Sequence, residues 1–114
     1  MNLREKQSLF VKLLWRLLRT AEHLDYEVTL GEAYRTKQQA EWNAEQGVGI
    51  ANSVHCQRLA VDLNLFKHGR LLSATEDYAE LGAQWKMLDQ LCRWGGDFAK
   101  PDGGHFSLWH GGRA

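Results

Sequence analysis

The sequence predicts an α+β fold in which a small antiparallel sheet is flanked by helices. Two long segments, residues 2–24 and 76–94, carry apolar residues at the three-and-four spacing of a helix. Between them, residues 59–66 place an aliphatic side chain at every second position, as expected for a strand with one buried face. A chain of 114 residues has room for one core, so we expect a single domain over residues 1–114.

The N-terminal half is predicted to contain two helices and one strand. The helix over residues 2–24 has its basic residues largely on the face opposite its leucines. A strand is predicted over residues 26–34. Thr36 then has the character of an N-cap for a helix over residues 37–46. Residues 47–52, which begin with glycine, are expected to form a flexible approach to the next motif.

The C-terminal half is predicted to continue with a turn, a helix and a final strand. Residues 67–70 are a candidate for a hairpin turn after the alternating strand. The second long helix is predicted over residues 76–94 and is expected to stop at the Gly95-Gly96 pair. A turn over residues 101–104 then leads into a short strand over residues 105–110.

Charge and composition exclude several classes of protein. Fourteen basic and fourteen acidic residues cancel, which gives no case for a nucleic-acid binder. Residues 1–19 are basic, and this segment is either a solvated helix face or one suited to an anionic surface such as a wall or membrane. No stretch approaches the roughly 20 apolar residues that span a bilayer, so we expect no stable membrane insertion.

The N-terminus and the cysteines bear on where the protein is made. The first apolar run is broken by basic residues, unlike that of a signal peptide. We therefore expect synthesis in the cytoplasm and another route to any site of action outside it. The two cysteines, Cys56 and Cys92, are expected to be free thiols rather than a disulfide framework.

Two short motifs carry the residues of a metal site. His55 and Asp62 stand seven positions apart, and Asp102 stands three residues before His105. Two imidazoles and a carboxylate can hold a zinc ion and leave its fourth position free for water. Asp102 can then accept a proton from that water. Taken alone, Asp62 also fits the solvated side of a half-buried sheet.

Other residues compete for these roles. His110 is a rival to His105, but five residues along one strand is an odd offset, which would place the two rings on opposite faces. Cys56 is a soft ligand beside His55, although sequence neighbours rarely share a metal. Arg35 follows the first predicted strand, where a guanidinium can stabilise an oxyanion or can simply be a surface side chain.

The motifs resemble those of a known family of zinc peptidases. Residues 53–62 read SVHCQRLAVD against the family pattern SxHxxGxAxD, and residues 102–105 place an acid three residues before a histidine. Residues 34–36 resemble the Tyr-Arg-Ser/Thr segment, and residues 94–98 the turn before the second motif. The chain thus resembles, over about residues 27–110, the D-alanyl-D-alanine carboxypeptidase and dipeptidase superfamily of bacterial cell-wall metabolism. That superfamily includes phage endolysins that are L-alanyl-D-glutamate peptidases.

The resemblance implies a hedgehog/DD-peptidase-like fold and one zinc ion held by His55, Asp62 and His105. It implies that Asp102 is the general base and that Arg35 steadies the substrate carbonyl and its oxyanion. An aspartate in the place of the base, where other branches often have glutamate, favours the L-alanyl-D-glutamate branch.

Two further residues belong to the implied substrate site. Ser53 matches the family's Ser/Thr near the substrate and is assigned a binding role. Arg58 stands where the family usually has glycine, so the loop is expected to avoid the backbone geometry that glycine alone tolerates well. Arg58 is also a candidate to contact a substrate carboxylate. The Gly103-Gly104 pair replaces a bulkier or proline-containing pair.

The implied function is that of a monomeric zinc metallopeptidase that cleaves an amide bond in the peptide stem of peptidoglycan. The preferred form is an L-Ala–D-Glu endopeptidase of a phage or prophage lysis system, released to the wall through a pore. A D-Ala-D-Ala carboxypeptidase or dipeptidase is the alternative. Two other classes stay open: a zinc-bearing wall-binding module without catalysis, and a metal-independent glycosidase that uses two carboxylates such as Glu32 and Asp62.

Overall fold

The computed structural model describes residues 1–47 and 53–114, and its strands form one antiparallel sheet. The order across the sheet is β1-β2-β5-β4, and β3 pairs with β2 as a hairpin. The segment predicted as a flexible approach lies, except for Gly47, outside the described residues. The strands are β1 (Glu27–Leu30), β2 (Ala60–Lys67), β3 (Arg70–Leu71), β4 (Cys92–Trp94) and β5 (His105–Leu108).

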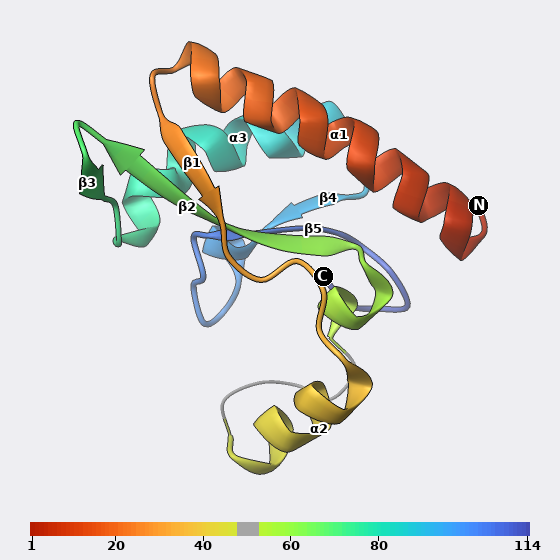
Figure 1. Ribbon diagram of the computed structural model, residues 1–114. Helices are drawn as coiled ribbons and strands as arrows, with labels where there is room; N and C mark the ends of the chain where they lie inside the picture. The colour runs from red at the N-terminus through yellow and green to blue at the C-terminus, as the bar shows by residue number, and fades with distance from the viewer. Residues whose placement is uncertain (48–52) are drawn as a thin grey trace.

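Two of the helices cover one face of this sheet, as Figure 1 shows, and the third lies apart on the other side. The first two are α1 (Leu3–His23) and α3 (Ala79–Leu88), and the third is α2 (Lys37–Glu45). Three short 3₁₀ turns complete the described part of the chain: η1 (Val54–Gln57), η2 (Thr75–Tyr78) and η3 (Gly95–Asp97). The predicted α+β class, a small antiparallel sheet with flanking helices, is confirmed.

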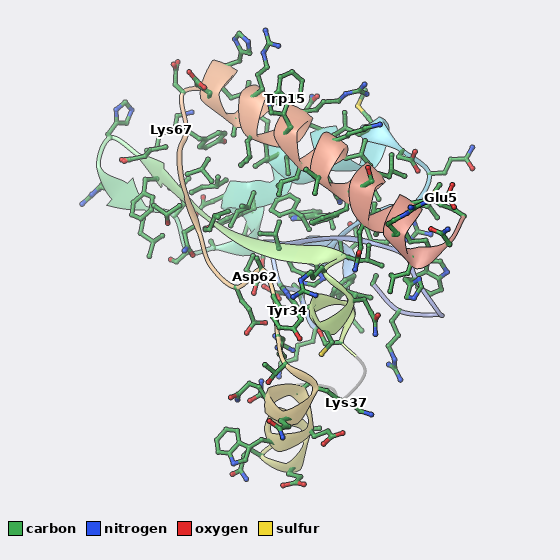
Figure 2. The ribbon with its side chains drawn as sticks, turned by 45° about the vertical axis from the view of Figure 1, so that its right-hand side comes forward. Glu5, Trp15, Tyr34, Lys37, Asp62 and Lys67 are labelled. Atoms are coloured by element: carbon green, nitrogen blue, oxygen red, sulfur yellow. The ribbon has the colours of Figure 1, made fainter. Side chains whose placement is uncertain are left out.

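Helix α1 forms where its apolar spacing predicts. Asn2 and Glu5 make a reciprocal capping box at its start, which satisfies two backbone N–H groups that the helix leaves free. Its buried residues pack toward the sheet, whereas Trp15 is exposed on the outer side. Figure 2 shows Trp15 and Asp62 on opposite sides of the sheet. The buried residues of the helix are Phe10, Leu13, Leu17 and Ala21.

Strand β2 has the alternation that its sequence predicts. Val61, Leu63 and Leu65 are buried in the core, and Asp62 and Asn64 are partly exposed on the opposite face. The helices therefore cover the aliphatic face of the strand, and the polar face is left for the site. Among the described residues, no helix is both long and apolar enough to cross a membrane.

The hairpin turn is confirmed at His68 and Gly69, which join Lys67 to its partner Arg70. Both turn residues have positive φ, 53° and 75°, as a two-residue hairpin loop of type I′ requires. The predicted N-cap of the second helix is also confirmed, because the Thr36 hydroxyl accepts a hydrogen bond from the Gln39 N–H at 3.0 Å.

The helix predicted over residues 76–94 is wrong in its C-terminal part. Helix α3 ends at Leu88, because Asp89 has extended backbone geometry and its carboxylate accepts a hydrogen bond from the Leu91 N–H. Residues 92–94 form β4 and pair with β5. The Trp85 indole N–H donates to the carbonyls of both strands, which ties α3 to this pairing.

The first and last strands are shorter than predicted. Strand β1 ends at Leu30, after which the Gly31 N–H donates to the Asp62 carbonyl and the Asp62 N–H to the Glu32 carbonyl, both at 2.7 Å. Strand β5 ends at Leu108, and His110 instead makes an isolated bridge with Arg113.

Candidate metal centre

Strand register brings the first two candidate ligands together. In the antiparallel pair β2–β5, Asp62 lies directly opposite His105. Side chains at directly opposed positions share one face of a sheet and are close neighbours. The Asp62 Oδ1 atom is accordingly 3.4 Å from His105 Nδ1. Two residues 43 positions apart in the sequence therefore present ligand atoms to the same point.

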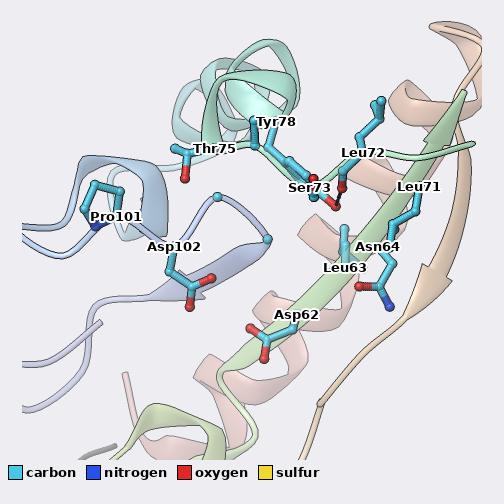
Figure 3. Close-up of a pocket in the computed structure, with 13 residues that line it drawn as sticks. Asp62, Leu63, Asn64, Leu71, Leu72, Ser73, Thr75, Tyr78, Pro101 and Asp102 are labelled. Carbon is cyan, nitrogen blue, oxygen red and sulfur yellow. Dashed lines mark hydrogen bonds between the residues drawn. The ribbon is translucent and has the colours of Figure 1, made fainter. Parts of the chain in front are cut away.

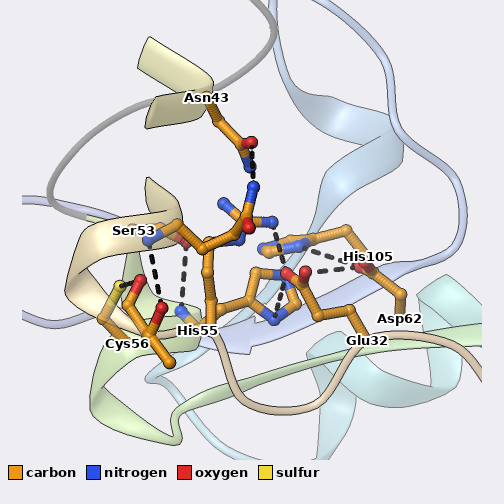
Figure 4. A network of polar contacts seen from close by, with 10 residues as sticks. Glu32, Asn43, Ser53, His55, Cys56, Asp62 and His105 are labelled. Carbon is orange, nitrogen blue, oxygen red and sulfur yellow. Dashed lines mark hydrogen bonds and ion pairs between the residues drawn. The ribbon is translucent and has the colours of Figure 1, made fainter. Parts of the chain in front are cut away.

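The third candidate ligand comes from the turn before β2. Ser53 caps η1 by accepting a hydrogen bond from the His55 N–H at 3.2 Å. Arg58 then reverses the chain, so that His55 Nε2 lies 3.4 Å from Asp62 Oδ1. The His55 and His105 side chains are 3% and 8% exposed, and their ring centroids are 5.1 Å apart. Figure 4 shows both rings directed at the Asp62 carboxylate.

This trio has the composition and geometry of a zinc site. One ligand atom from each of His55, Asp62 and His105 lies within 4.8 Å of the other two. The Asp62 Oδ1 atom is buried and makes no hydrogen bond of its own. Two imidazoles and one carboxylate suit Zn²⁺ and leave a coordination position open, as in catalytic rather than structural zinc sites. The residues present therefore fit the metal.

The electrostatics of Asp62 favour the charged ligand. Burial raises the pKa of the Asp62 carboxyl, but the neighbouring His105 and His55 rings outweigh it and hold the pKa below its usual value. The carboxylate is therefore ionised near neutral pH, in the form that binds a cation.

The loop that carries Asp102 is fixed by the turn before it. The Asp102 N–H donates to the Gly95 carbonyl at 2.9 Å, and the Trp94 indole N–H donates to the Gly103 carbonyl at 2.7 Å. A Cβ at Gly95 would lie 2.8 Å from the Cβ of His105, closer than real atoms approach. The close approach of η3 to His105 at the start of β5 therefore requires glycine at position 95.

Asp102 faces the same space as the candidate ligand Asp62. Both line a pocket of about 390 Å³ that extends along β2 toward Asn64, Thr75 and Tyr78. Figure 3 shows the two carboxylates directed into this pocket from opposite sides. Among the residues that the structure describes, no lysine, arginine or histidine lines it. An acid at this position can exchange protons with a group held in the pocket.

Arg35 is held by a carboxylate that sequence reasoning did not assign to the metal site. Its guanidinium forms an ion pair with Glu32 Oε1, which also lies 3.7 Å from His55 Nδ1 (Figure 4). The Arg35 side chain is largely buried, and its Nε makes no hydrogen bond. In the sequence, the signal for this contact is that Glu32 lies three residues before a candidate arginine. As a glycosidase pair, Glu32 and Asp62 are disfavoured because each already faces cationic or imidazole partners.

The backbone expectation for Arg58 is wrong. The residue does not avoid the left-handed geometry but adopts it, with φ 56° and ψ 38°. Such geometry costs a non-glycine residue roughly 1–2 kcal/mol. The Arg58 guanidinium lies 4.1 Å from the centre of the Tyr34 ring, a cation–π contact that offsets part of this cost. Arg58 does not line the pocket shared by Asp62 and Asp102, so its assigned substrate contact stays a prediction.

The rival ligands lie elsewhere. His110 Nδ1 is 3.1 Å from Lys6 Nζ, and the nearest polar partner of Cys56 Sγ is the Thr36 carbonyl at 3.8 Å. Within the described residues, neither belongs to the ligand trio. Ser53 adjoins the site through the His55 N–H, and its substrate-binding role stays a prediction.

Comparisons with known proteins agree with this description of the fold and show the family. A family model described as D-alanyl-D-alanine carboxypeptidase matches residues 46–108, more than half of the chain. The chain therefore belongs to the D-alanyl-D-alanine carboxypeptidase family, and the resemblance drawn from its motifs is confirmed.

The fold is similar to that of a solved structure. It is the crystal structure of the Serratia marcescens L-Ala D-Glu endopeptidase ChiX, with a TM-score of 0.70 and 22% sequence identity. The match covers 86% of this chain and 78% of that one. A comparison with curated protein sequences gives no significant match.

Proposed function

We propose that this protein is a zinc-dependent peptidase that hydrolyses an amide bond in the peptide stem of peptidoglycan. The observation that carries the proposal is the meeting of His55, Asp62 and His105 beside a pocket that Asp102 also lines. Membership of the D-alanyl-D-alanine carboxypeptidase family supports a peptidase that acts on cell-wall peptides.

The proposed mechanism assigns separate roles to the three ligands, Asp102 and Arg35. His55, Asp62 and His105 would hold one zinc ion, which, when bound, lowers the pKa of a water molecule and polarises a carbonyl. Asp102 takes the proton of the attacking water on its carboxylate and delivers it to the leaving nitrogen. Arg35 offsets the negative charge that develops on the carbonyl oxygen.

Within this family we propose cleavage of the L-Ala–D-Glu bond. An aspartate at position 102 supports this choice, and so does the shared fold with a protein named as an L-Ala D-Glu endopeptidase. The second candidate is removal of terminal D-Ala, which the description of the matching family favours. We further propose that the protein is monomeric and belongs to a phage or prophage lysis system that releases it to the wall through a pore.

The test is mass spectrometry of purified peptidoglycan incubated with zinc-loaded protein, with and without a chelator. New amino termini on D-Glu that disappear on chelation are the expected result, whereas loss of terminal D-Ala would support the second candidate. New reducing sugar ends would contradict a peptidase. An unchanged digest would point to a binding module.

Two matched variants test the role of Asp102. Asp102→Asn removes the proton acceptor and leaves the three ligands in place, so we expect a loss of turnover of about 10²–10⁴-fold with zinc still bound. Asp97→Asn is the control, because Asp97 is an exposed carboxylate of the preceding turn that pairs with Lys86. Equal activity of the two variants would remove Asp102 from the mechanism.

A further inference from the structure

We infer that Glu32 is a positioning residue that orients His55 and Arg35 around the metal centre and thereby sets the affinity of the site for zinc. This inference rests on the proposed zinc site and concerns a residue outside the ligand trio. Glu32 lies in the segment after β1, where the chain has left the regular ladder but still contacts β2.

One carboxylate oxygen of Glu32 lies close to two neighbouring side chains. Its Oε1 atom is buried, pairs with the Arg35 guanidinium, and lies 3.7 Å from His55 Nδ1. Because the Nε2 atom of His55 faces Asp62, Nδ1 is the outer nitrogen of the ring. In the part of the chain that the structure describes, Glu32 is the only carboxylate within 4 Å of this Nδ1.

A carboxylate at this position has a defined effect on a histidine ligand. Metal-bound histidines usually donate the N–H of their other ring nitrogen to a carboxylate, a carbonyl or a water, which fixes the tautomer and the ring orientation. A proton held on His55 Nδ1 by Glu32 leaves the lone pair of Nε2 directed at Asp62 and the metal position. His55 Nδ1 is buried and has no hydrogen-bond partner, and Glu32 Oε1 at 3.7 Å needs only a short movement to accept its N–H.

The negative charge of Glu32 also compensates Arg35. The Arg35 side chain is only 15% exposed, so its cation is poorly solvated. Without Glu32, an unpaired guanidinium would remain on a residue whose main-chain N–H donates to the His55 carbonyl, and a positive charge near His55 disfavours a divalent cation bound there. Both effects of the carboxylate, ring orientation and charge compensation, raise the affinity for zinc.

The main chain of Glu32 has a separate role that a side-chain substitution leaves intact. Its carbonyl accepts a hydrogen bond from the Asp62 N–H at 2.7 Å, and the adjacent Gly31 N–H donates to the Asp62 carbonyl at the same distance. Replacing the Glu32 side chain therefore removes the contacts to His55 and Arg35 but keeps the segment attached to β2.

The test measures the zinc dissociation constant of Glu32→Gln by competition with a chromophoric chelator. We expect binding about 10–100-fold weaker than in the unmodified protein, the range found for partners of metal ligands. The absorption bands of the Co²⁺-substituted protein should also shift, because His55 changes orientation. Asp97→Asn, which removes a carboxylate from the exposed ion pair with Lys86, should bind zinc within about twofold of the unmodified protein.

A double variant covers the case in which Glu32→Gln folds poorly. Glu32→Gln/Arg35→Gln removes both charges and so leaves no unpaired guanidinium, yet His55 still lacks its carboxylate. We expect it to bind zinc at least about tenfold more weakly than Arg35→Gln alone. Equal zinc affinities and identical Co²⁺ spectra with and without Glu32 would overturn the positioning role. Failure of the unmodified protein to bind zinc would instead overturn the proposed zinc site.

Discussion

The substitution Trp94→Phe tests whether the turn before the second motif fixes the loop of Asp102 and His105. Trp94 is 8% exposed, and its indole N–H donates to the carbonyl of the buried Gly103 at 2.7 Å. Gly103 lies between the proposed base and a candidate ligand. Phenylalanine keeps an aromatic ring against Gly82, where an added Cβ would collide with the indole, but it removes the donor and the outer ring atoms that lie against Gly96.

The expected cost follows from the carbonyl left without a partner. A buried acceptor that loses its hydrogen bond destabilises a protein by about 1–3 kcal/mol. In a chain of 114 residues each kcal/mol lowers the melting temperature by about 4 °C, so we expect a decrease of about 4–12 °C. Because the loop is then less well fixed, the folded variant should also bind zinc about tenfold more weakly.

The assays are thermal unfolding of the metal-free protein and chelator competition for zinc. The matched control is Trp85→Phe, which removes an indole donor to the Arg93 and Ser107 carbonyls in the core. It should be at least as destabilised but bind zinc with unchanged affinity when folded. A Trp94→Phe variant that loses no stability, or two variants that lose zinc affinity equally, would show that this indole does not fix the Asp102 loop.

Three further predictions concern pH, thiol reactivity and the pocket wall. Burial raises the pKa of the Asp62 carboxyl, but the flanking imidazoles lower it below the ordinary value of 3.8. The ionised carboxylate therefore stabilises the metal-free fold fully above pH 3.8. This stabilisation is lost as the pH falls through the lowered folded-state pKa. Metal-free Asp62→Asn should therefore be less stable than the unmodified protein at about pH 6, and denaturant titrations should show the gap closing in strong acid; a constant gap would contradict this. Burial raises the pKa of the Cys92 thiol to about 12. Iodoacetamide at about pH 8 should therefore label only the partly exposed Cys56 in the folded protein. Two adducts by mass spectrometry would be inconsistent with the buried thiol. Tyr78→Phe removes a hydroxyl that accepts a hydrogen bond from the Leu65 N–H at 3.1 Å and donates one to the Leu72 carbonyl at 2.7 Å. The free energy of unfolding in denaturant should fall by about 1–3 kcal/mol. No loss would mean that water replaces the hydroxyl.

Much of the fold was predictable because local pattern and tertiary packing agree. The aliphatic face of β2 meets the helices, and Asp62 falls on the other face, as alternation along a strand requires. The hairpin at His68-Gly69 was predictable because a turn depends on residues that adjoin in the sequence. Helix α3 was overestimated because Leu91 and Cys92 continue the helical spacing, whereas pairing with β5 decides their structure.

The candidate site was predictable to the extent that its motifs have fixed spacing. His55, Asp62 and His105 were chosen from two motifs, but their meeting depends on the register that sets Asp62 opposite His105, which no local pattern specifies. Glu32 was missed as a partner of the site because a single acid after a strand has no distinctive spacing, and its contacts with His55 and Arg35 arise only in the folded chain. Arg58 was misjudged because its stacking on Tyr34 is equally a tertiary contact.

The metal content of the purified protein is the direct test of the zinc site. Elemental analysis after incubation with zinc and removal of the excess should give one zinc ion per chain, and His55→Ala, Asp62→Ala and His105→Ala should each retain well below one while remaining folded by circular dichroism. The same zinc-loaded sample should cleave purified peptidoglycan, and the three variants should not. A folded protein that binds no zinc, or variants that keep a full equivalent of it, would contradict the assignment of His55, Asp62 and His105 as the metal centre.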